Sequence, residues 1–135
     1  MPDLNARRIN PPENGPANGY SHVLVVDPGV STVYISGQVP VDEQGAVLAV
    51  GDLAGQTEVV FEHLGRALAA AGASWKDLVR MTTYLTDMRD LAAVRTVRGR
   101  FLDPTALPTS TLVEVSCLFH PDFLIEVDAI AAVRR

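Results

Sequence analysis

The chain has 135 residues, 47% hydrophobic and 20% charged, a balance that suits a single globular domain over residues 1–135. Its 16 acidic residues outnumber its 11 basic ones, and a net charge of −5 gives no general attraction for nucleic acid. No apolar run approaches the ~20 residues that cross a bilayer, and none follows the N-terminal charges as in a signal peptide. With a single cysteine, Cys117, no internal disulfide can form, so we expect a cytoplasmic protein with neither a membrane nor a nucleic-acid partner.

The N-terminal third predicts short strands joined by turns. Residues 1–19 are rich in Pro, Asn and Gly, which is typical of an extended or loop segment. Apolar and β-branched runs at 22–26 and 32–36 predict two strands. A third strand is predicted to start at 39–41, followed by a tight turn.

In the rest of the chain, the spacing of apolar residues alternates between that of a helix and that of a strand. Asp52 can cap a helix predicted over about 53–71, with Gly72 at the position favoured just after a helix. A strand is predicted at 78–86, with its odd-numbered residues on one face. A second helix follows Asp87 or Asp90 and stops at Asp103-Pro104. Strands at 109–116 and 123–133 complete an α+β order, β-β-β-α-β-α-β-β.

The first strands also bear on assembly. The run Val23–Val26 has no polar break, so both faces of its sheet need a cover. Two helices of this length cover one face. A second copy of the chain is the simplest cover for the other face, and loops with the N-terminal arm are the alternative.

Metal and cofactor chemistry find no support in the sequence. His22, His63 and His120 have no ligand spacing, and one cysteine adds none. Neither a glycine-rich phosphate loop nor a Gly-X-Ser-X-Gly motif is present. We therefore predict a protein that works without a cofactor.

Carboxylates inside the last apolar strand are the best candidates for chemistry. Glu126 and Asp128 are two residues apart, so a strand places them on one face. A carboxylate in such a strand is paired, lies at an interface or is tuned for acid–base work. A solvated strand face is the alternative that spacing alone leaves open.

Several segments, in order along nearly the whole chain, resemble motifs of the Rid (reactive intermediate deaminase, or YjgF-like) family. They are Asn18-Gly19-Tyr20-Ser21-His22, Ser36-Gly37-Gln38-Val39-Pro40, Ala70-Ala71-Gly72-Ala73-Ser74, Thr83-Tyr84-Leu85-Thr86-Asp87-Met88, Val113-Glu114-Val115 and Ile125-Glu126-Val127-Asp128-Ala129-Ile130-Ala131. Each motif alone is weak, but together, at matching spacing, they are specific.

The resemblance implies a chorismate-mutase-like fold: a mixed six-stranded sheet with two helices on one face. It also implies a homotrimer with a small-molecule site in the clefts between subunits. Many members hydrolyse reactive enamines and imines, such as 2-aminoacrylate, to a 2-oxo acid and ammonia without a cofactor.

Carried over residue by residue, the family's pocket tyrosine is Tyr20 and its water-holding glutamate is Glu126, which we take as catalytic. Its Ser-Gly backbone groups belong to Ser36 and Gly37. The family's arginine, which holds the substrate carboxylate, is replaced here by Ser110 in the segment Pro108-Thr109-Ser110-Thr111. A serine supplies neither charge nor a two-pronged donor, so we expect little activity on 2-aminoacrylate.

Arg95 is a second departure, since many members carry asparagine at that position. We predict that Arg95 partly replaces the missing arginine, so that Ser36, Gly37, Ser110, Thr111 and Arg95 bind substrate. A solvated helix arginine is the alternative. Beside the hydrolase hypothesis stand a non-catalytic small-molecule binder or regulatory trimer and, less favoured by the acidic charge, an endoribonuclease.

Overall fold

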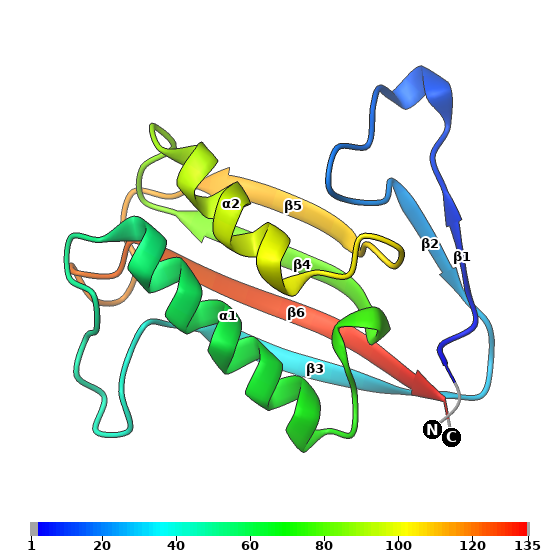
Figure 1. Ribbon diagram of the computed structural model, residues 1–135, viewed down its shortest axis with the longest axis horizontal. Helices are drawn as coiled ribbons and strands as arrows, with labels where there is room; N and C mark the ends of the chain where they lie inside the picture. Colours follow the sequence, from blue (N-terminus) through cyan, green and yellow to red (C-terminus); the bar gives the residue numbers. More distant parts are fainter. Residues whose placement is uncertain (1–2, 135) are drawn as a thin grey trace.

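The computed structural model describes residues 3–134, in which six strands and two α-helices form (Figure 1). The strands are β1 Ala6–Ile9, β2 Val23–Val26, β3 Val30–Gln38, β4 Leu78–Leu85, β5 Thr109–Glu114 and β6 Ile125–Arg134. The helices are α1 Leu53–Ala70 and α2 Leu91–Phe101, and short 3-10 turns occur at Pro12–Asn14 and Trp75–Asp77.

Hydrogen bonds divide the six strands into two sets. Four strands form a mixed sheet in the order β3-β6-β4-β5, in which β4 and β5 run parallel and the other pairs antiparallel. Strands β1 and β2 pair with each other and form an arm at one end of the molecule (Figure 1). The predicted α+β fold, with six strands and two helices on one face, is confirmed.

One local prediction in the N-terminal third was wrong. Residues 39–41 form no third strand, because Pro40 has no N–H to donate to a ladder and only an isolated bridge joins Val41 to Val47. Residues 6–9 lie in the segment expected to be extended or a loop, and they form a strand that pairs with β2. That pairing joins residues far apart in the chain, which local composition does not report.

Helix α1 begins and ends where the sequence signals place it. The Asp52 side chain accepts a hydrogen bond from the Gly55 N–H at 3.0 Å. At the other end Gly72 adopts a positive φ of 73°, and the Ala73 N–H bonds back to the Leu68 carbonyl at 2.8 Å. Between these caps one face of the helix is fully buried against the sheet, at Val60, Phe61, Leu64 and Leu68.

The two helices cover only one face of the four-stranded sheet (Figure 1). On β6 the residues Ile125, Val127, Ala129 and Ala131 are buried in the core beneath them. On the opposite face the side chain of Tyr34 is 79% exposed. The four-stranded sheet therefore has an uncovered face. In the arm, the paired residues Ile9 and Val23 are also exposed, at 42% and 39%.

One buried polar residue joins α1 to two loops. Gln56 is fully buried, and its Nε2 donates to the carbonyls of Leu48 and Asp122 at 3.2 and 2.8 Å. Its Oε1 accepts from the Leu124 N–H at 2.8 Å. The bonds to Asp122 and Leu124 hold the segment before β6 against the helix, and the bond to Leu48 holds the loop before α1.

We predict that Gln56→Leu lowers the free energy of unfolding by about 1–3 kcal/mol or more, because it leaves buried backbone groups without partners. Chemical denaturation measures the change. Gln44→Leu, in an exposed turn, is the control and should stay within about 0.5 kcal/mol of the parent. Equal stability of the two variants would contradict the assigned role.

Candidate functional site

Glu126 lies directly against Gly37 on the uncovered face of the sheet. The β3–β6 register shifts between Ile35 and Gln38, so Ser36 and Gly37 form a bulge opposite Asp128. A β-carbon at Gly37 would overlap Oε2 of Glu126 and lie 2.7 Å from its carboxyl carbon. Glycine at this position therefore makes the room in which the Glu126 carboxylate sits.

A second carboxylate and a tyrosine complete this cluster. The Tyr84 hydroxyl donates to Oδ2 of Asp128 at 3.1 Å, and Tyr84 pairs with Glu126 across β4 and β6. Burial and then the charge of Asp128 raise the pKa of Glu126. The hydrogen bond to Asp128, with burial and both carboxylate charges, raises the pKa of Tyr84. We call Gly37, Tyr84, Glu126 and Asp128 the carboxylate cluster.

Tyr20 lies elsewhere, in the loop that leads to β2. This loop is fixed to the segment before β5, because the buried Ser21 donates from its hydroxyl to the Leu107 carbonyl and from its N–H to the Pro108 carbonyl, both at 2.9 Å. The Tyr20 hydroxyl makes a long bond of 3.4 Å to the Pro16 carbonyl, and its ring meets His22 edge-on. Tyr20 is half-buried.

Ser110 and Thr111 begin strand β5 beside that loop. Ser110 pairs with Met81 on β4. It is two residues from Leu112, so both side chains lie on the same face of the sheet, and Leu112 packs against the core beneath the helices. Thr111 lies between them in the strand, so its side chain is on the opposite, uncovered face, where it is exposed and shares that face with Glu126.

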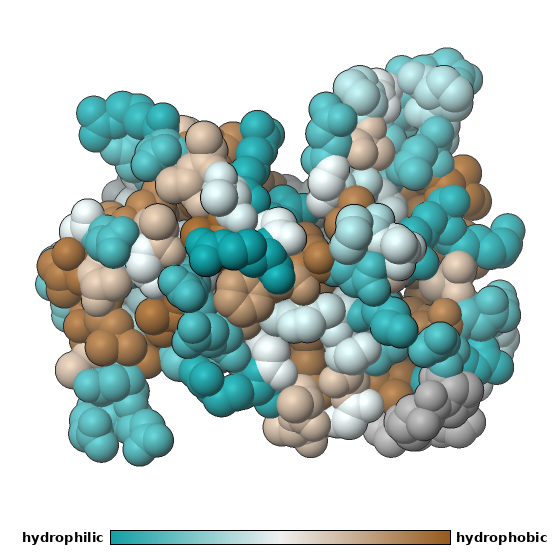
Figure 2. Space-filling view, viewed as in Figure 1, coloured by the Kyte–Doolittle hydropathy of each residue, from teal (hydrophilic) through white to brown (hydrophobic). Residues whose placement is uncertain are grey.

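Arg95 lies on α2 and lines a cavity of about 420 Å³ between that helix, the Tyr20 loop and the segment before β5. The cavity is lined by Asn18, Gly19, Arg95, Arg98, Gly99, Leu102, Pro104 and Leu107, and we call it the arginine pocket. Arg98 is partly buried, and its Nη2 donates to the Gly19 carbonyl at 2.6 Å. Figure 2, drawn from the helix side, shows the N-terminal arm separated by a notch from the body of the molecule.

The residues predicted for one site thus fall into two groups within one chain. Ser36, Gly37 and Glu126 come together on the uncovered face of the sheet. Ser110 pairs with Met81, three positions along β4 from Tyr84, the partner of Glu126. Ser110 and Glu126 are therefore three residues apart along the strands and two strand spacings apart across the sheet, with β4 between them. At roughly 3.3 Å per residue and 4.8 Å per strand spacing, their Cα atoms are separated by about 14 Å. Arg95, on a helix that covers the other face, does not meet Glu126 within one chain.

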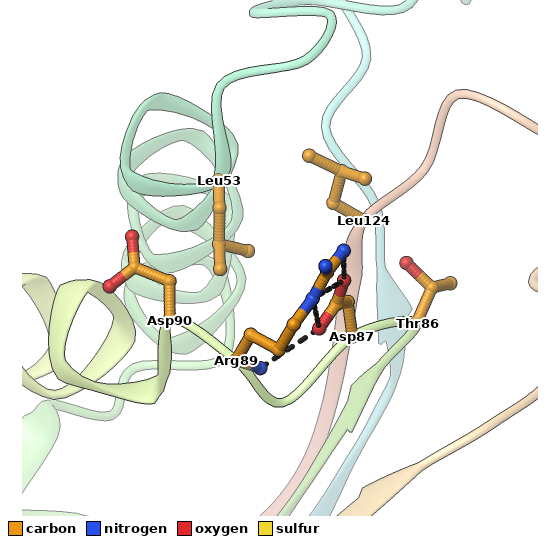
Figure 3. A pocket seen from close by; sticks show the side chains of 6 residues that line it. All are labelled: Leu53, Thr86, Asp87, Arg89, Asp90 and Leu124. Atoms are coloured by element: carbon orange, nitrogen blue, oxygen red, sulfur yellow. Dashed lines mark hydrogen bonds and ion pairs between the residues drawn. The ribbon is translucent and has the colours of Figure 1, made fainter.

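A further pocket, of about 250 Å³, lies where β4 leads into α2 (Figure 3). None of the predicted site residues lines it. The Arg89 guanidinium there is bound by both carboxylate oxygens of Asp87, which lowers the pKa of that carboxyl (Figure 3). This cation already has its counter-ion.

No cluster of three or more His, Cys, Asp or Glu side chains able to hold a metal occurs in residues 3–134. No helix in that range has the length and hydropathy to cross a bilayer.

Known proteins identify the family. The sequence model described as "Endoribonuclease L-PSP" matches residues 11–133. The chain also resembles the crystal structure of the Rid-family protein YyfB from Yersinia pestis, of unknown function, at a TM-score of 0.88 and 32% identity over 96% of this chain and 100% of that one. The chain belongs to the Rid, or YjgF-like, family.

The chain is also similar in sequence to two named proteins. This Rid-family chain is 40% identical over 112 residues to Protein DfrA of Myxococcus xanthus, covering 83% of each chain. It is 39% identical over 101 residues to 3-aminoacrylate deaminase RutC of Acinetobacter baylyi, covering 75% of this chain and 79% of the relative. The family of this chain therefore includes proteins named as deaminases.

Sequence reasoning missed two residues beside the predicted sites. Tyr84 could have been found, because the odd-numbered residues of its strand were placed together on one face, which puts Tyr84 on the opposite face. Arg98 could not, since its place in the pocket depends on a loop 79 positions away in the chain.

We predict that Asp128→Asn lowers the pKa of Glu126 and leaves it above the ordinary value. The substitution removes the repelling charge, which raises that pKa, but leaves the larger contribution of burial in place. Carboxyl-detected NMR titration measures the shift. Glu43→Gln, on an exposed turn, is the control and should leave the Glu126 titration unchanged. An unmoved pKa in Asp128→Asn would show that the two carboxylates do not interact.

Proposed function

We propose that this Rid-family protein is a cofactor-independent hydrolase or deaminase that acts on a small imine or enamine, with Glu126 as the group that activates water. The observation that carries the proposal is the setting of Glu126: a half-buried carboxylate with a raised pKa, seated against a glycine whose missing side chain makes its space. A base whose pKa lies closer to neutral transfers protons more effectively at neutral pH.

The proposed reaction needs only water and proton transfer. An enamine first gains a proton from solvent on carbon and becomes an iminium ion. Water then adds to the iminium carbon and gives one proton to Glu126, which leaves a neutral adduct with a hydroxyl and an amino group on that carbon. Glu126 returns this proton to the nitrogen, the C–N bond breaks as the hydroxyl oxygen forms the carbonyl, and the hydroxyl proton passes to solvent, so enamine and water become a carbonyl compound and ammonia. Tyr20, which we keep as a catalytic residue, would contribute its hydroxyl.

A complete site requires two copies of the chain in this proposal. Glu126, Ser36 and Gly37 are grouped on one side of the chain, while Tyr20, Ser110 and Arg95 are grouped on the other. An intersubunit cleft in a cytoplasmic homotrimer would bring one copy's carboxylate cluster against the next copy's arginine pocket, with Thr111 on the uncovered sheet face between. The exposed Tyr34 on that face supports burial by a neighbour.

A non-catalytic binder or regulatory trimer is the second candidate. Ser110 stands where the family's substrate-holding arginine would be, and it cannot form a charge-assisted bond. The family's description as an endoribonuclease raises a third possibility, which the net charge of −5 disfavours.

We predict that Glu126→Gln reduces turnover by about 10²–10⁴-fold, because the amide keeps the shape but accepts no proton. Imines generated in place by an amino-acid oxidase serve as substrates, and ammonia release reports the rate. The three-carbon 2-aminoacrylate should react weakly in the parent.

Two further variants sharpen this test. Gly37→Ala should also lower turnover, because its methyl group displaces the Glu126 carboxylate, whereas Glu43→Gln should not. Full activity of Glu126→Gln would refute the mechanism. A parent inactive on every imine, with its fold intact, would favour the binder.

We predict a stable homotrimer, with a mass by light scattering of three times the 14.5 kDa chain at micromolar concentration. Tyr34→Glu should lower the mass, because it places a charge on the face that we expect to be buried. Gln44→Glu, in an exposed turn, should not. A single-chain mass for the parent would contradict the assembly.

A further inference from the structure

The arginine pocket has an unusual balance of charge. Arg95 and Arg98 are one helical turn apart on α2, where side chains three positions apart are neighbours. Neither guanidinium forms an ion pair with a carboxylate of residues 3–134, in which the ion pairs are Lys76 with Asp3 and Arg89 with Asp87. No acidic residue lines the cavity. Two positive charges thus face one space without a counter-ion.

The setting of Arg98 disfavours its charge. Burial and then the charge of Arg95 lower the pKa of Arg98, although a guanidinium remains charged. Arg98 donates one N–H to the Gly19 carbonyl, and its guanidinium has further N–H donors. Arg95 makes no hydrogen bond or ion pair in the described part of the chain. An anion between them would relieve the repulsion and fill the free donors.

The pocket also has an apolar part. Leu102, Pro104 and Leu107 line this part. Its volume of about 420 Å³ lies within the range of small-molecule sites, about 300–1,000 Å³. A bare inorganic anion would leave this apolar wall unused.

We propose that the arginine pocket binds the carboxylate of a small organic acid with a hydrocarbon side chain, through Arg95 and Arg98 together, with the side chain against Leu102, Pro104 and Leu107. This inference rests on the proposed function for the nature of the acid, a branched 2-oxo acid or its imine. Arg98 is then a residue that determines specificity, and the preferred acid is larger than three carbons.

Binding is measured on the intact protein by titration calorimetry with 4-methyl-2-oxopentanoate. Pyruvate tests the role of the hydrocarbon chain, and the uncharged 4-methylpentanamide tests the carboxylate. We expect pyruvate to bind at least about tenfold more weakly than the branched acid, from the loss of buried methylene groups. The amide should bind more weakly by a similar or larger factor.

Three arginine variants and one control locate the site. Arg95→Gln and Arg98→Gln should each weaken binding of the branched acid about tenfold or more, and Arg98→Lys should restore it only in part. Arg100→Gln, an exposed arginine on the same helix outside the pocket, should leave it unchanged. Because Arg95 is exposed, its variant remains informative if Arg98→Gln fails to fold.

The outcomes separate this inference from the proposed function. Arginine-dependent binding in a protein that hydrolyses no imine supports the pocket and counts against the hydrolase. Turnover that needs Glu126 but not Arg95 or Arg98, or binding of the acid and amide with equal affinity, overturns the pocket. Tighter binding of inorganic phosphate than of the branched acid also overturns it.

Discussion

The alternation of side chains along β6 is the constraint on which the rest of the structure depends. This strand is paired on both sides, by β3 and by β4, so every backbone hydrogen bond fixes its register. Its odd-numbered residues enter the core beneath α1, and its even-numbered residues place Glu126 and Asp128 on the uncovered face. A slip of one residue would exchange the two sets, burying charge and exposing the core. The hydrophobic core thus fixes the side of the sheet on which the carboxylates stand.

The neighbours of β6 then determine the state of those carboxylates. The bulge in β3 brings Gly37 under Glu126, and the missing β-carbon lets the carboxylate lie close to the backbone. Partial burial there disfavours the charged form, as does Asp128, whose position is fixed by the Tyr84 hydroxyl. Holding the carboxylates of Glu126 and Asp128 side by side costs free energy. If residue 126 had only a structural role, a neutral side chain would avoid that cost. An arrangement that raises a carboxylate's pKa without neutralising it is typical of acid–base sites.

The sequence predicts what is local and leaves open what depends on distant contacts. Helix α1 is predictable because Asp52, the apolar spacing and Gly72 agree. The shared face of Glu126 and Asp128 follows from their spacing of two. The pairing of β1 with β2 could not be read from composition, because a strand of four residues in a Pro-rich segment owes its existence to its partner. The division of the site residues into two groups likewise depends on which strands lie between β5 and β6, and strand order is a property of the tertiary fold.

Ser110 stands where the resemblance places the family's arginine, and the geometry shows which other cations lie near that position. The Tyr20 loop contacts both the start of β5 and helix α2. Ser21 donates to the carbonyl of Leu107, just before Ser110, and Arg98 donates to the carbonyl of Gly19. A positive charge lost from β5 can therefore be supplied from α2 without leaving that region. The direction of approach differs, because an arginine on α2 reaches a carboxylate across the apolar residues that follow the helix. In the proposed assembly, an acid held this way would span that apolar wall before its reactive carbon met a neighbouring copy's Glu126. The proposed relocation of charge would thus link the identity of residue 110 to the length of the ligand.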